Sequence, residues 1–408
     1  MKFLTIENIS TFVVLILAPF LIISRTTADL MVVSVSLFFL YYSYKKKDFH
    51  WLKEKWFQYF IIFWIYLLTI NTFFSVNPTN TFFYALSFIR WPLFALAISI
   101  LFSNRRYYKL FLWSLSFTIF FVIFDVWYQY IFRYDIFGLP AYDINRLTGP
   151  FGQNPVPGIF ITRYLFLLIT LFLFYRVSIS NNLKLFIACS LIIIGLISVF
   201  ITGERMSFIL YLSSAILVGS SLLYKHPYFK LIMLFSIFFS FSLLLIFFFI
   251  DENIANRMLY STLDKLTNFS TSDYGILYKV ALNSWLENPL VGGGLHQFKN
   301  IYPLYGPEVV VGVGKILHAH NIPLGLLAET GVLGLILYYA VIYQILKFCF
   351  NLIKDNKNIS QFILLLNLLY LCFFPFMTAY SFSHNWMGAM IWCVTGFVLM
   401  LSKSEKNV

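Results

Sequence analysis

Long apolar runs recur along this chain, and they restrict its possible folds more than any other feature. Many of them reach about 20 residues, the length that an α-helix needs to cross a lipid bilayer. Charged residues make up 11% of the 408 residues and the mean hydropathy is +0.80, whereas a soluble domain carries about 25% charged residues. The sequence therefore predicts an all-α integral membrane protein, with a single polytopic membrane domain over residues 1–408.

The apolar runs divide into about 12 predicted transmembrane helices. No small-residue cleavage site follows the first run, near Thr11 to Ile23, so we interpret it as a retained helix and not as a removed signal peptide. A long polar segment separates the ninth predicted helix from the tenth. The predicted spans cover residues 9–24, 29–44, 56–75, 81–103, 108–132, 157–176, 184–201, 206–224, 230–250, 322–349, 360–380 and 385–402.

Lysine and arginine residues gather in every second connection. If the N-terminus is cytoplasmic, the other cytoplasmic segments are YKKKDFHWLKEK, SNRRYYK, YRVSISNNLK, YKHPYFK, LIKDNKN and the KSEKN tail. The opposite connections, such as NTFFSVNPTN and SFSHN, contain no lysine or arginine. This asymmetry is the positive-inside pattern, and it predicts cytoplasmic N- and C-termini. It also accounts for the net charge of +12 without a nucleic-acid partner.

Several motifs that bind cofactors or nucleotides are missing from the sequence. No DxD pair is present to hold a nucleotide sugar through a metal ion, and no GxxxxGK[ST] loop is present to bind ATP. The four cysteines fall inside apolar runs and form no CxxC pair, so we expect them to act as small apolar side chains. We therefore expect neither a cofactor nor a bound metal. The cysteines are Cys189, Cys349, Cys372 and Cys393.

Two segments on the predicted outer side are longer than a simple connection requires. They run from Phe132 to Gly158 and from Asp251 to Asn321. Within the second, YGILYKVALNSWLENP mixes apolar and polar residues at helical spacing, which predicts a helix on the outer surface. Long loops in compact proteins usually carry function or are disordered. These segments are rich in aromatic residues and glycine, so we predict that the periplasmic insertion at residues 251–321 is ordered and bears part of an active site.

A polar cluster, HAHN, stands immediately before the tenth predicted helix. Histidine has an unperturbed pKa of about 6.5 and can accept and return a proton near neutral pH. His318 and His320 are therefore candidates for a general base that activates a hydroxyl. In the structural alternative, Asn321 caps the helix, Pro323 occupies its first turn, and the histidines are solvated. A metal site built on the HxH pair would lack a clear third ligand.

Four arginines lie in or beside the apolar runs. Arg205 is in the short outer turn ITGERMSF, and Arg146 is in the first long outer segment. Arg163 and Arg90 fall within predicted spans, where ionisable residues are functional candidates because their burial is costly. The planar guanidinium group is suited to phosphate. Together with a histidine, these arginines indicate a site for an anionic, membrane-embedded substrate such as a lipid pyrophosphate.

Polar and small residues continue into the tenth predicted helix. Glu329 lies about two turns inside it. We expect Glu329 to pair with an arginine such as Arg205, or to orient His320, because an unpaired buried carboxylate is costly. Gly331 and Gly334 are expected to allow close packing of helices within the bilayer.

The order of these motifs resembles that of the O-antigen ligase and polymerase superfamily. TGER in a short outer turn is followed by ENPLVGGGLHQF and then by HAHNIPLGLLAETGVLGL, and RLTGPFGQNP precedes all three. HxHN with a downstream ExGxxG and an upstream NPLxGxG is a fairly specific combination, although each piece alone is weak. The likeness extends over about half the chain, from Arg146 to about Tyr339.

The resemblance implies a glycosyltransferase of the bacterial inner (cytoplasmic) membrane that acts on the periplasmic face without a metal ion. Such enzymes transfer a glycan from undecaprenyl pyrophosphate to a hydroxyl. By position in the motifs, His320 would be the general base and Arg205 a diphosphate-binding group. We add His318 as a second catalytic candidate. The other candidate substrate-binding residues are Arg146, Arg163, Arg90, Asn321 and Glu329.

Three functions remain open at this point. An O-antigen ligase transfers the glycan to lipid A–core, which is the function that we expect. A polymerase extends another carrier-linked repeat unit, and a ligase to another acceptor such as protein would use the same donor chemistry. The third function is a 12-helix transporter, but no repeat relates the two halves, and the polar residues gather at the outer ends of the spans instead of at the midplane.

One position departs from the family pattern. The ligases usually carry a second arginine in the outer loop, and this chain has Tyr274 at the corresponding position. Lys279 and Arg257 could supply the positive charge, but neither is in register. The residues that hold the diphosphate are therefore only partly assigned by the resemblance.

Overall fold

The computed structural model describes residues 6–23, 25–143, 146–175, 179–223, 251–306, 318–354, 359–376 and 381–404, together with separate residues between 234 and 249. All the named secondary-structure elements in these residues are helices, and Tyr134 and Asp143 take part only in isolated β-bridges. Eight of the described helices are long and apolar enough to cross a membrane. The all-α, multi-pass membrane class predicted from the sequence is confirmed.

Most predicted spans correspond to one helix each, with three differences. The span at 81–103 is a helix in two parts that meet at Ile89, and the span at 230–250 lies mostly outside the described residues. α16 has 15 residues, or about 22 Å of helix, less than the roughly 30 Å of a bilayer core. The bundle helices are α1 (Ile6–Ile23), α2 (Arg25–Lys46), α3 (Lys55–Tyr66), α4 (Pro78–Phe88), α5 (Arg90–Leu101), α6 (Arg105–Phe132), α7 (Pro157–Phe174), α8 (Asn181–Ile201), α9 (Arg205–Leu223), α15 (Ile322–Lys354), α16 (Ile359–Phe373) and α17 (Asn385–Ser404).

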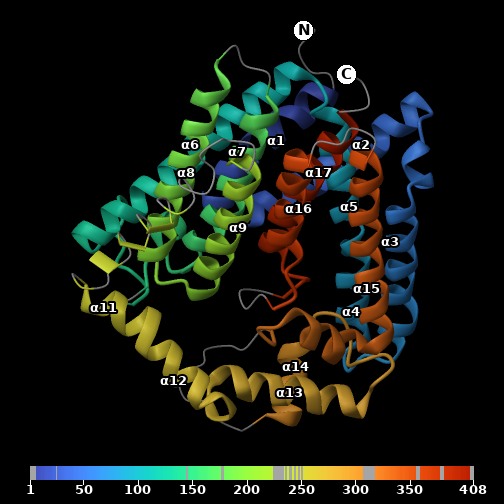
Figure 1. Ribbon diagram of the computed structural model, residues 1–408. Coiled ribbons are helices and arrows are strands. Elements are labelled where there is room, and N and C mark those ends of the chain that lie inside the picture. Colours follow the sequence, from blue (N-terminus) through green and yellow to red (C-terminus); the bar gives the residue numbers. More distant parts are fainter. Residues whose placement is uncertain are drawn as a thin grey trace.

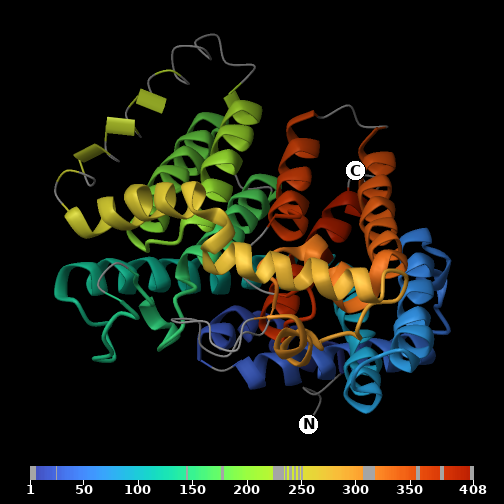
Figure 2. The same cartoon turned by 90° about the horizontal axis from the view of Figure 1, so that it is seen from below.

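Four further helices cover one end of this bundle, which we call the loop end (Figure 1). Viewed from that side, they cross the bundle from α8 and α9 towards α15 (Figure 2). The sequence predicts a helix at residues 274–289, and the structure has α13 there. The loop helices are α11 (Glu252–Ala255), α12 (Ser261–Thr267), α13 (Asp273–Glu287) and α14 (Phe298–Tyr305), with a π-helical turn, η4 (Asn256–Tyr260), between the first two.

Contacts between helix ends define the opposite end of the bundle. Lys403 forms an ion pair with Glu54, with 3.4 Å between Nζ and Oε1, and its ammonium lies over the ring of Phe348. The rings of Tyr108 and Tyr175 stack with 5.6 Å between their centroids. The ends of α7, α15 and α17 thus lie at the same end of the bundle as the starts of α3 and α6. The basic connections near these residues are therefore on the side away from the loop helices.

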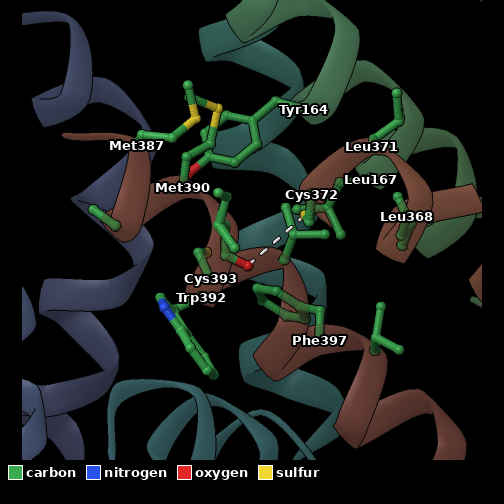
Figure 3. Close-up of a cluster of buried hydrophobic side chains, with 14 of the residues drawn as sticks. Tyr164, Leu167, Leu368, Leu371, Cys372, Met387, Met390, Trp392, Cys393 and Phe397 are labelled. Carbon is green, nitrogen blue, oxygen red and sulfur yellow. Dashed lines mark hydrogen bonds between the residues drawn. The ribbon is translucent and has the colours of Figure 1, made fainter. Parts of the chain in front are cut away.

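The centre of the bundle is filled by α7 and α17. Figure 3 shows Tyr164 of α7 together with Cys372 of α16 and Cys393 and Phe397 of α17 in one packed cluster. The Cys372 thiol contacts the carbonyl oxygen of Ile391 at 3.9 Å. The four cysteines are free and three of them are buried. They act as small apolar side chains, as the sequence predicts.

The membrane helix α15 is interrupted at Gly331, where φ is +63°. An added Cβ at this position would lie 2.3 Å from the carbonyl oxygen of Leu290, so only glycine fits. Gly331 therefore admits the backbone of a segment that we call the glycine segment, Asn288–Gly294. The predicted role of Gly331 in close packing is correct, but its neighbour is this segment and not another helix.

The glycine segment supplies the hydrogen bonds that α15 loses at its interruption. Backbone groups in a bilayer need such internal partners because no water is present to replace them. Asn71, in the π-helical turn η2 (Leu67–Asn71) after α3, donates to the carbonyl oxygens of Val291 and Glu329 at 2.8 and 2.9 Å. The segment is thus fixed against two membrane helices. Four backbone bonds of 2.8–3.2 Å complete the joint, from the N–H groups of Val332, Leu333, Gly293 and Gly294 to the carbonyl oxygens of Pro289, Leu290, Ala328 and Glu329.

Candidate active site

The TGER turn joins three parts of the chain at the loop end. Gly203 adopts φ +70° in this turn, which favours glycine. The N–H of Leu147 donates to the carbonyl oxygen of Thr202 at 3.2 Å, and Nε of Arg257 donates to the carbonyl oxygen of Gly203 at 2.7 Å. The turn is therefore held between the segment before α7 and the loop helices.

Glu204 fixes the start of α7 from within this turn. Its carboxylate accepts hydrogen bonds from the N–H groups of Gly158 and Ile159 at 2.6 and 3.2 Å and from the hydroxyl of Ser207 at 2.8 Å. A carboxylate at a helix N-terminus is stabilised by unpaired N–H groups and by the helix dipole. Burial raises the pKa of Glu204, and the positive charge of Arg146 acts in the opposite direction. Glu204 is therefore a structural part of the site.

Three arginines meet at the TGER turn, and we call them the arginine cluster: Arg146, Arg205 and Arg257. Nε of Arg205 donates to the carbonyl oxygen of Arg257 at 3.0 Å, and its Nη2 donates to the hydroxyl of Ser261 at 2.6 Å. Nη2 of Arg146 donates to the carbonyl oxygen of Pro155 at 3.3 Å. The fold thus brings together arginines that lie far apart in the sequence and orients them mainly through neutral oxygens.

The positive charge of the arginine cluster is not neutralised by ion pairs within the described residues. None of the four ion pairs found there includes Arg146, Arg205 or Arg257. Burial, together with the like charges of the other two arginines, lowers the pKa of Arg257 to about 10. Arg257 remains protonated at neutral pH, because this value is still well above 7. A cluster of guanidinium groups is suited to binding a multiply charged anion.

Tyr274 lies between the arginine cluster and the HAHN segment. Its ring meets the ring of His320 edge to face, with 5.6 Å between the centroids. Its phenol is close enough to Arg257 to influence the pKa of that guanidinium. The ammonium of Lys265 lies over the Tyr274 ring at 5.2 Å from the centroid and pairs with Asp273. The residue that replaces an arginine of the family pattern therefore remains part of the site.

The HAHN segment is both a helix start and a cluster of side chains at the loop end. Asn321 Oδ1 accepts from the N–H of Leu324 at 3.0 Å, so Asn321 caps α15 as the sequence predicts. Its Nδ2 donates to the hydroxyl of Tyr278 on α13 at 3.2 Å. The rings of His318 and His320 lie 4.1 Å apart, and His320 adopts φ +52°. A left-handed non-glycine residue is strained, and such strain is frequent at functional sites.

A small recess opens beside this segment, and we call it the histidine recess. One wall is the start of α15 and the other is the connection before α17. Glu329 lies at its base and is 2% exposed. Its lining residues are His318, Ala319, His320, Asn321, Ile322, Gly325, Glu329, Ser381 and Phe382.

The predicted pairing of Glu329 with Arg205 is wrong. The two carboxylate oxygens of Glu329 accept from the N–H groups of His296 and Phe298 at 3.1 and 3.2 Å. Arg205 is directed towards η4 and α12. Backbone N–H groups satisfy the buried carboxylate instead, and they fix the start of α14 against α15. The sequence did not suggest them because donors in the backbone have no residue-type signature.

The two remaining arginines do not join the arginine cluster. Nε of Arg90 pairs with Asp29 at 3.1 Å, its Nη2 donates to Asn385 at 2.9 Å, and its guanidinium stacks over Trp91 at 4.2 Å. Arg90 therefore connects α5 to α2 and α17. Arg163 is 1% exposed and donates to the carbonyl oxygen of Ile159 at 3.3 Å, so it has almost no surface with which to contact a ligand.

Some site residues are missed or only partly indicated by the sequence. Arg257 is named there as an alternative out of register with the family pattern, and the loop helices bring it to the TGER turn. His296 stands two residues after the glycine segment, and that position is the one local signal that could have marked it. Ser381 and Ser383 lie in SFSHN, a short connection whose relevance depends on tertiary structure alone.

Comparison with known proteins gives matches over the region that contains most of this site. A family model described as O-Antigen ligase matches residues 190–339, which include TGER, the loop helices and HAHN. A protein from Rickettsia conorii whose name describes a polysaccharide ligase is 30% identical over 137 residues. That match spans 31% of this chain and 30% of the relative. Residues 190–339 are therefore similar in sequence to O-antigen ligases, and the chain spans less than a third of the length of the relative that it matches.

Proposed function

We propose that this protein is an O-antigen ligase that transfers a glycan from undecaprenyl pyrophosphate to a hydroxyl of lipid A–core. The observation that carries the proposal is the arginine cluster, which has no ion-pair partner among the described residues and which, like His320, adjoins Tyr274. A diphosphate needs several positive charges, and an acceptor hydroxyl needs a base. The two requirements are met by adjacent parts of one site.

The proposed reaction is a single displacement at the anomeric carbon of the glycan. The acceptor oxygen forms a bond to this carbon while the bond from the carbon to the phosphate oxygen breaks. Undecaprenyl pyrophosphate leaves with the electron pair of that bond, and its developing negative charge is stabilised by Arg146, Arg205 and Arg257. His320 accepts the proton of the acceptor hydroxyl. Three guanidinium charges would make a metal ion unnecessary, and metal independence is part of the proposal.

The same proposal assigns an orientation in the bacterial inner membrane. The loop end would face the periplasm, where lipid A–core and the carrier-linked glycan meet, and both termini would face the cytoplasm. The basic connections at the opposite end support this orientation through the positive-inside rule. A C-terminal alkaline phosphatase fusion should then be inactive, since that enzyme requires export. Full phosphatase activity would contradict the orientation.

A paired complementation experiment tests the function. The wild-type chain and His320→Ala are expressed in one strain that lacks its ligase and in another that lacks its O-antigen polymerase, and the lipopolysaccharide ladder is recorded. We expect the ladder to return only in the ligase-deficient strain, and His320→Ala to lower transfer by a factor of about 10²–10⁴. His50→Ala, at an exposed position, is the matched control, and membrane abundance is measured for each variant. A ladder that returns only in the polymerase-deficient strain would reassign the acceptor to a carrier-linked repeat unit.

A further inference from the structure

A chain of hydrogen-bonding side chains connects the end of the glycine segment to the histidine recess. Nδ1 of His296 lies 3.1 Å from the hydroxyl oxygen of Ser383. That oxygen lies 2.9 Å from the hydroxyl oxygen of Ser381, and Ser381 lines the recess beside His318 and His320. Three side chains from two distant segments thus form one hydrogen-bonded line that ends at the wall of the recess, which His320 also lines.

His296 is held in place from three directions. Its ring stacks on Tyr84 with 3.9 Å between centroids and 24° between planes. Its N–H donates to Glu329 at 3.1 Å, and its backbone has φ +61°. The left-handed conformation is unfavourable for a histidine. The fold maintains this conformation, and it places Nδ1 within hydrogen-bonding distance of Ser383.

The chain carries no net charge at neutral pH. Burial, together with the positive charge of Lys299, lowers the pKa of His296 to about 4. A neutral imidazole offers one donor and one acceptor, and a serine hydroxyl offers one donor and two acceptors. This side of the site therefore differs from the arginine cluster: it presents neutral groups that both donate and accept, which suits the hydroxyls of a sugar and not a diphosphate.

Ser381 keeps one hydrogen-bonding position for a ligand. Of the three positions on its hydroxyl, one accepts from the N–H of Ser383 at 3.3 Å, and one is used by the hydroxyl of Ser383. The third is unassigned among the described residues, and Ser381 borders the recess together with the ring of Phe382. An aromatic ring beside a hydroxyl is a common way to hold a sugar ring, through its apolar face and its hydroxyl edge.

We infer that the histidine recess, whose accessible volume of about 10 Å³ admits a group the size of one hydroxyl, receives a hydroxyl of a sugar acceptor whose ring stays outside it. Ser381 binds this hydroxyl, while Ser383 and His296 position Ser381. The inference rests on the proposed function and assigns its uncharged substrate. Ser381 would contact the substrate directly. His296 would act through Ser383, and its loss should therefore change acceptor recognition without changing how the carrier diphosphate is bound.

The test uses the full-length chain in proteoliposomes with donor lipid from a ligase-deficient strain. The apparent KM for lipid A–core is measured, and inhibition by undecaprenyl pyrophosphate reports separately on the arginine cluster. Ser381→Ala and His296→Phe are each expected to raise the acceptor KM by about 3- to 10-fold, since one neutral hydrogen bond contributes about 0.5–1.5 kcal/mol. Inhibition by undecaprenyl pyrophosphate should stay within about twofold of the wild type.

Two further variants separate positioning from simple destabilisation. His296→Asn tolerates the left-handed backbone and places an amide atom near the position of Nδ1, so it should keep the acceptor KM near the wild-type value. Ser213→Ala removes a serine that bonds to Tyr370 at 2.9 Å within the bundle, and it should leave both measurements unchanged. An unchanged acceptor KM in Ser381→Ala and His296→Phe, or equal effects on both measurements, overturns the inference. If the wild-type chain transfers to no acceptor, the proposed function fails and this inference fails with it.

Discussion

The arginine cluster and the histidine recess both adjoin Tyr274, and they are built in different ways. The first consists of three charged side chains that carbonyl and hydroxyl oxygens orient, with no carboxylate in an ion pair with them among the described residues. Short chains of hydrogen-bonded side chains border the second: His296, Ser383 and Ser381 form one, and Asn321 and Tyr278 form another. This difference is what the proposed function requires, because its donor carries an anionic diphosphate and its acceptor an uncharged hydroxyl.

The largest effect should come from the arginine cluster. Arg257→Ala removes one charge-assisted contact to the carrier, and such contacts contribute about 1.5–3 kcal/mol. We expect inhibition by undecaprenyl pyrophosphate to weaken by about 10- to 100-fold, while the KM for lipid A–core stays constant. Arg257→Lys should recover only part of the loss, because lysine cannot reproduce the planar fork of the guanidinium.

Arg133→Ala is the matched control for this experiment. Arg133 is a half-exposed cation in the segment after α6, and its Nη2 lies 4.0 Å from Asp251. If Arg133→Ala weakens inhibition as much as Arg257→Ala does, general surface charge attracts the carrier, and the cluster has no special role.

The second effect concerns the contact between α15 and the glycine segment. Gly331→Ala would place a Cβ 2.3 Å from the Leu290 carbonyl oxygen and force alanine to φ +63°. We expect a loss of at least about 2 kcal/mol, from the left-handed conformation and the contact together. The melting temperature of the purified protein in detergent measures this loss. Gly219→Ala, which meets nothing within 4 Å, should melt like the wild type, and equal melting temperatures for both variants would show that the joint tolerates a side chain.

A smaller effect is expected from Glu329, at the base of the recess. Glu329→Gln replaces one accepting oxygen with an N–H₂ group that faces a backbone N–H, so one of the two bonds to His296 and Phe298 is lost. The cost should be about 1–3 kcal/mol. We expect lower membrane abundance and a similar effect on the KM values for donor and acceptor. Normal abundance and normal transfer would show that neither bond stabilises α14 against α15.

The smallest effect is a dependence of stability on pH through His296. Its pKa is about 4 in the folded protein and about 6.5 when unfolded, so the unfolded chain binds more protons between these values. Stability should therefore rise with pH from 4 to 6.5, and the contribution of His296 between pH 5 and pH 7 is no more than about 2 kcal/mol. The melting temperature of His296→Phe should fall less on acidification than that of the wild type. If the melting temperatures of the two proteins fall equally on acidification, groups other than His296 cause the pH dependence.

The structure agrees with the predictions from the sequence wherever a local pattern determines the fold. Apolar runs gave the membrane class, the capping position of Asn321 gave the start of α15, and the mixed pattern at 274–289 gave α13. Each of these features depends on neighbours within a few turns of the chain. The motifs TGER and HAHN also lie on one loop end, as their positions between spans predict.

The composition of the site was harder to predict because tertiary structure assembles it. Counting along the sequence leaves Arg257 and Lys279 as alternatives that are both out of register, but the helices of the outer loop bring the Arg257 side chain to Gly203. The same arrangement gives Glu329 two backbone donors instead of an arginine. Arg90 satisfied the rule that buried charges are functional candidates, yet its partners Asp29 and Asn385 show that it connects helices. Its partners could not be inferred without knowing that α2 and α17 lie beside α5.

The interruption of α15 also has a consequence for biogenesis. Residues 288–294 leave the ribosome before α15 does, and Asn71 leaves it much earlier, but the open carbonyl and N–H groups of α15 find partners only when all three segments are in place. α15 therefore cannot complete its hydrogen bonds during its own insertion. A chain in which this joint fails would keep polar backbone exposed at the membrane surface, where a protease that inspects membrane proteins could recognise it. Gly331 allows the glycine segment to approach α15. The same interruption leaves α15 open to degradation until this segment has packed against it.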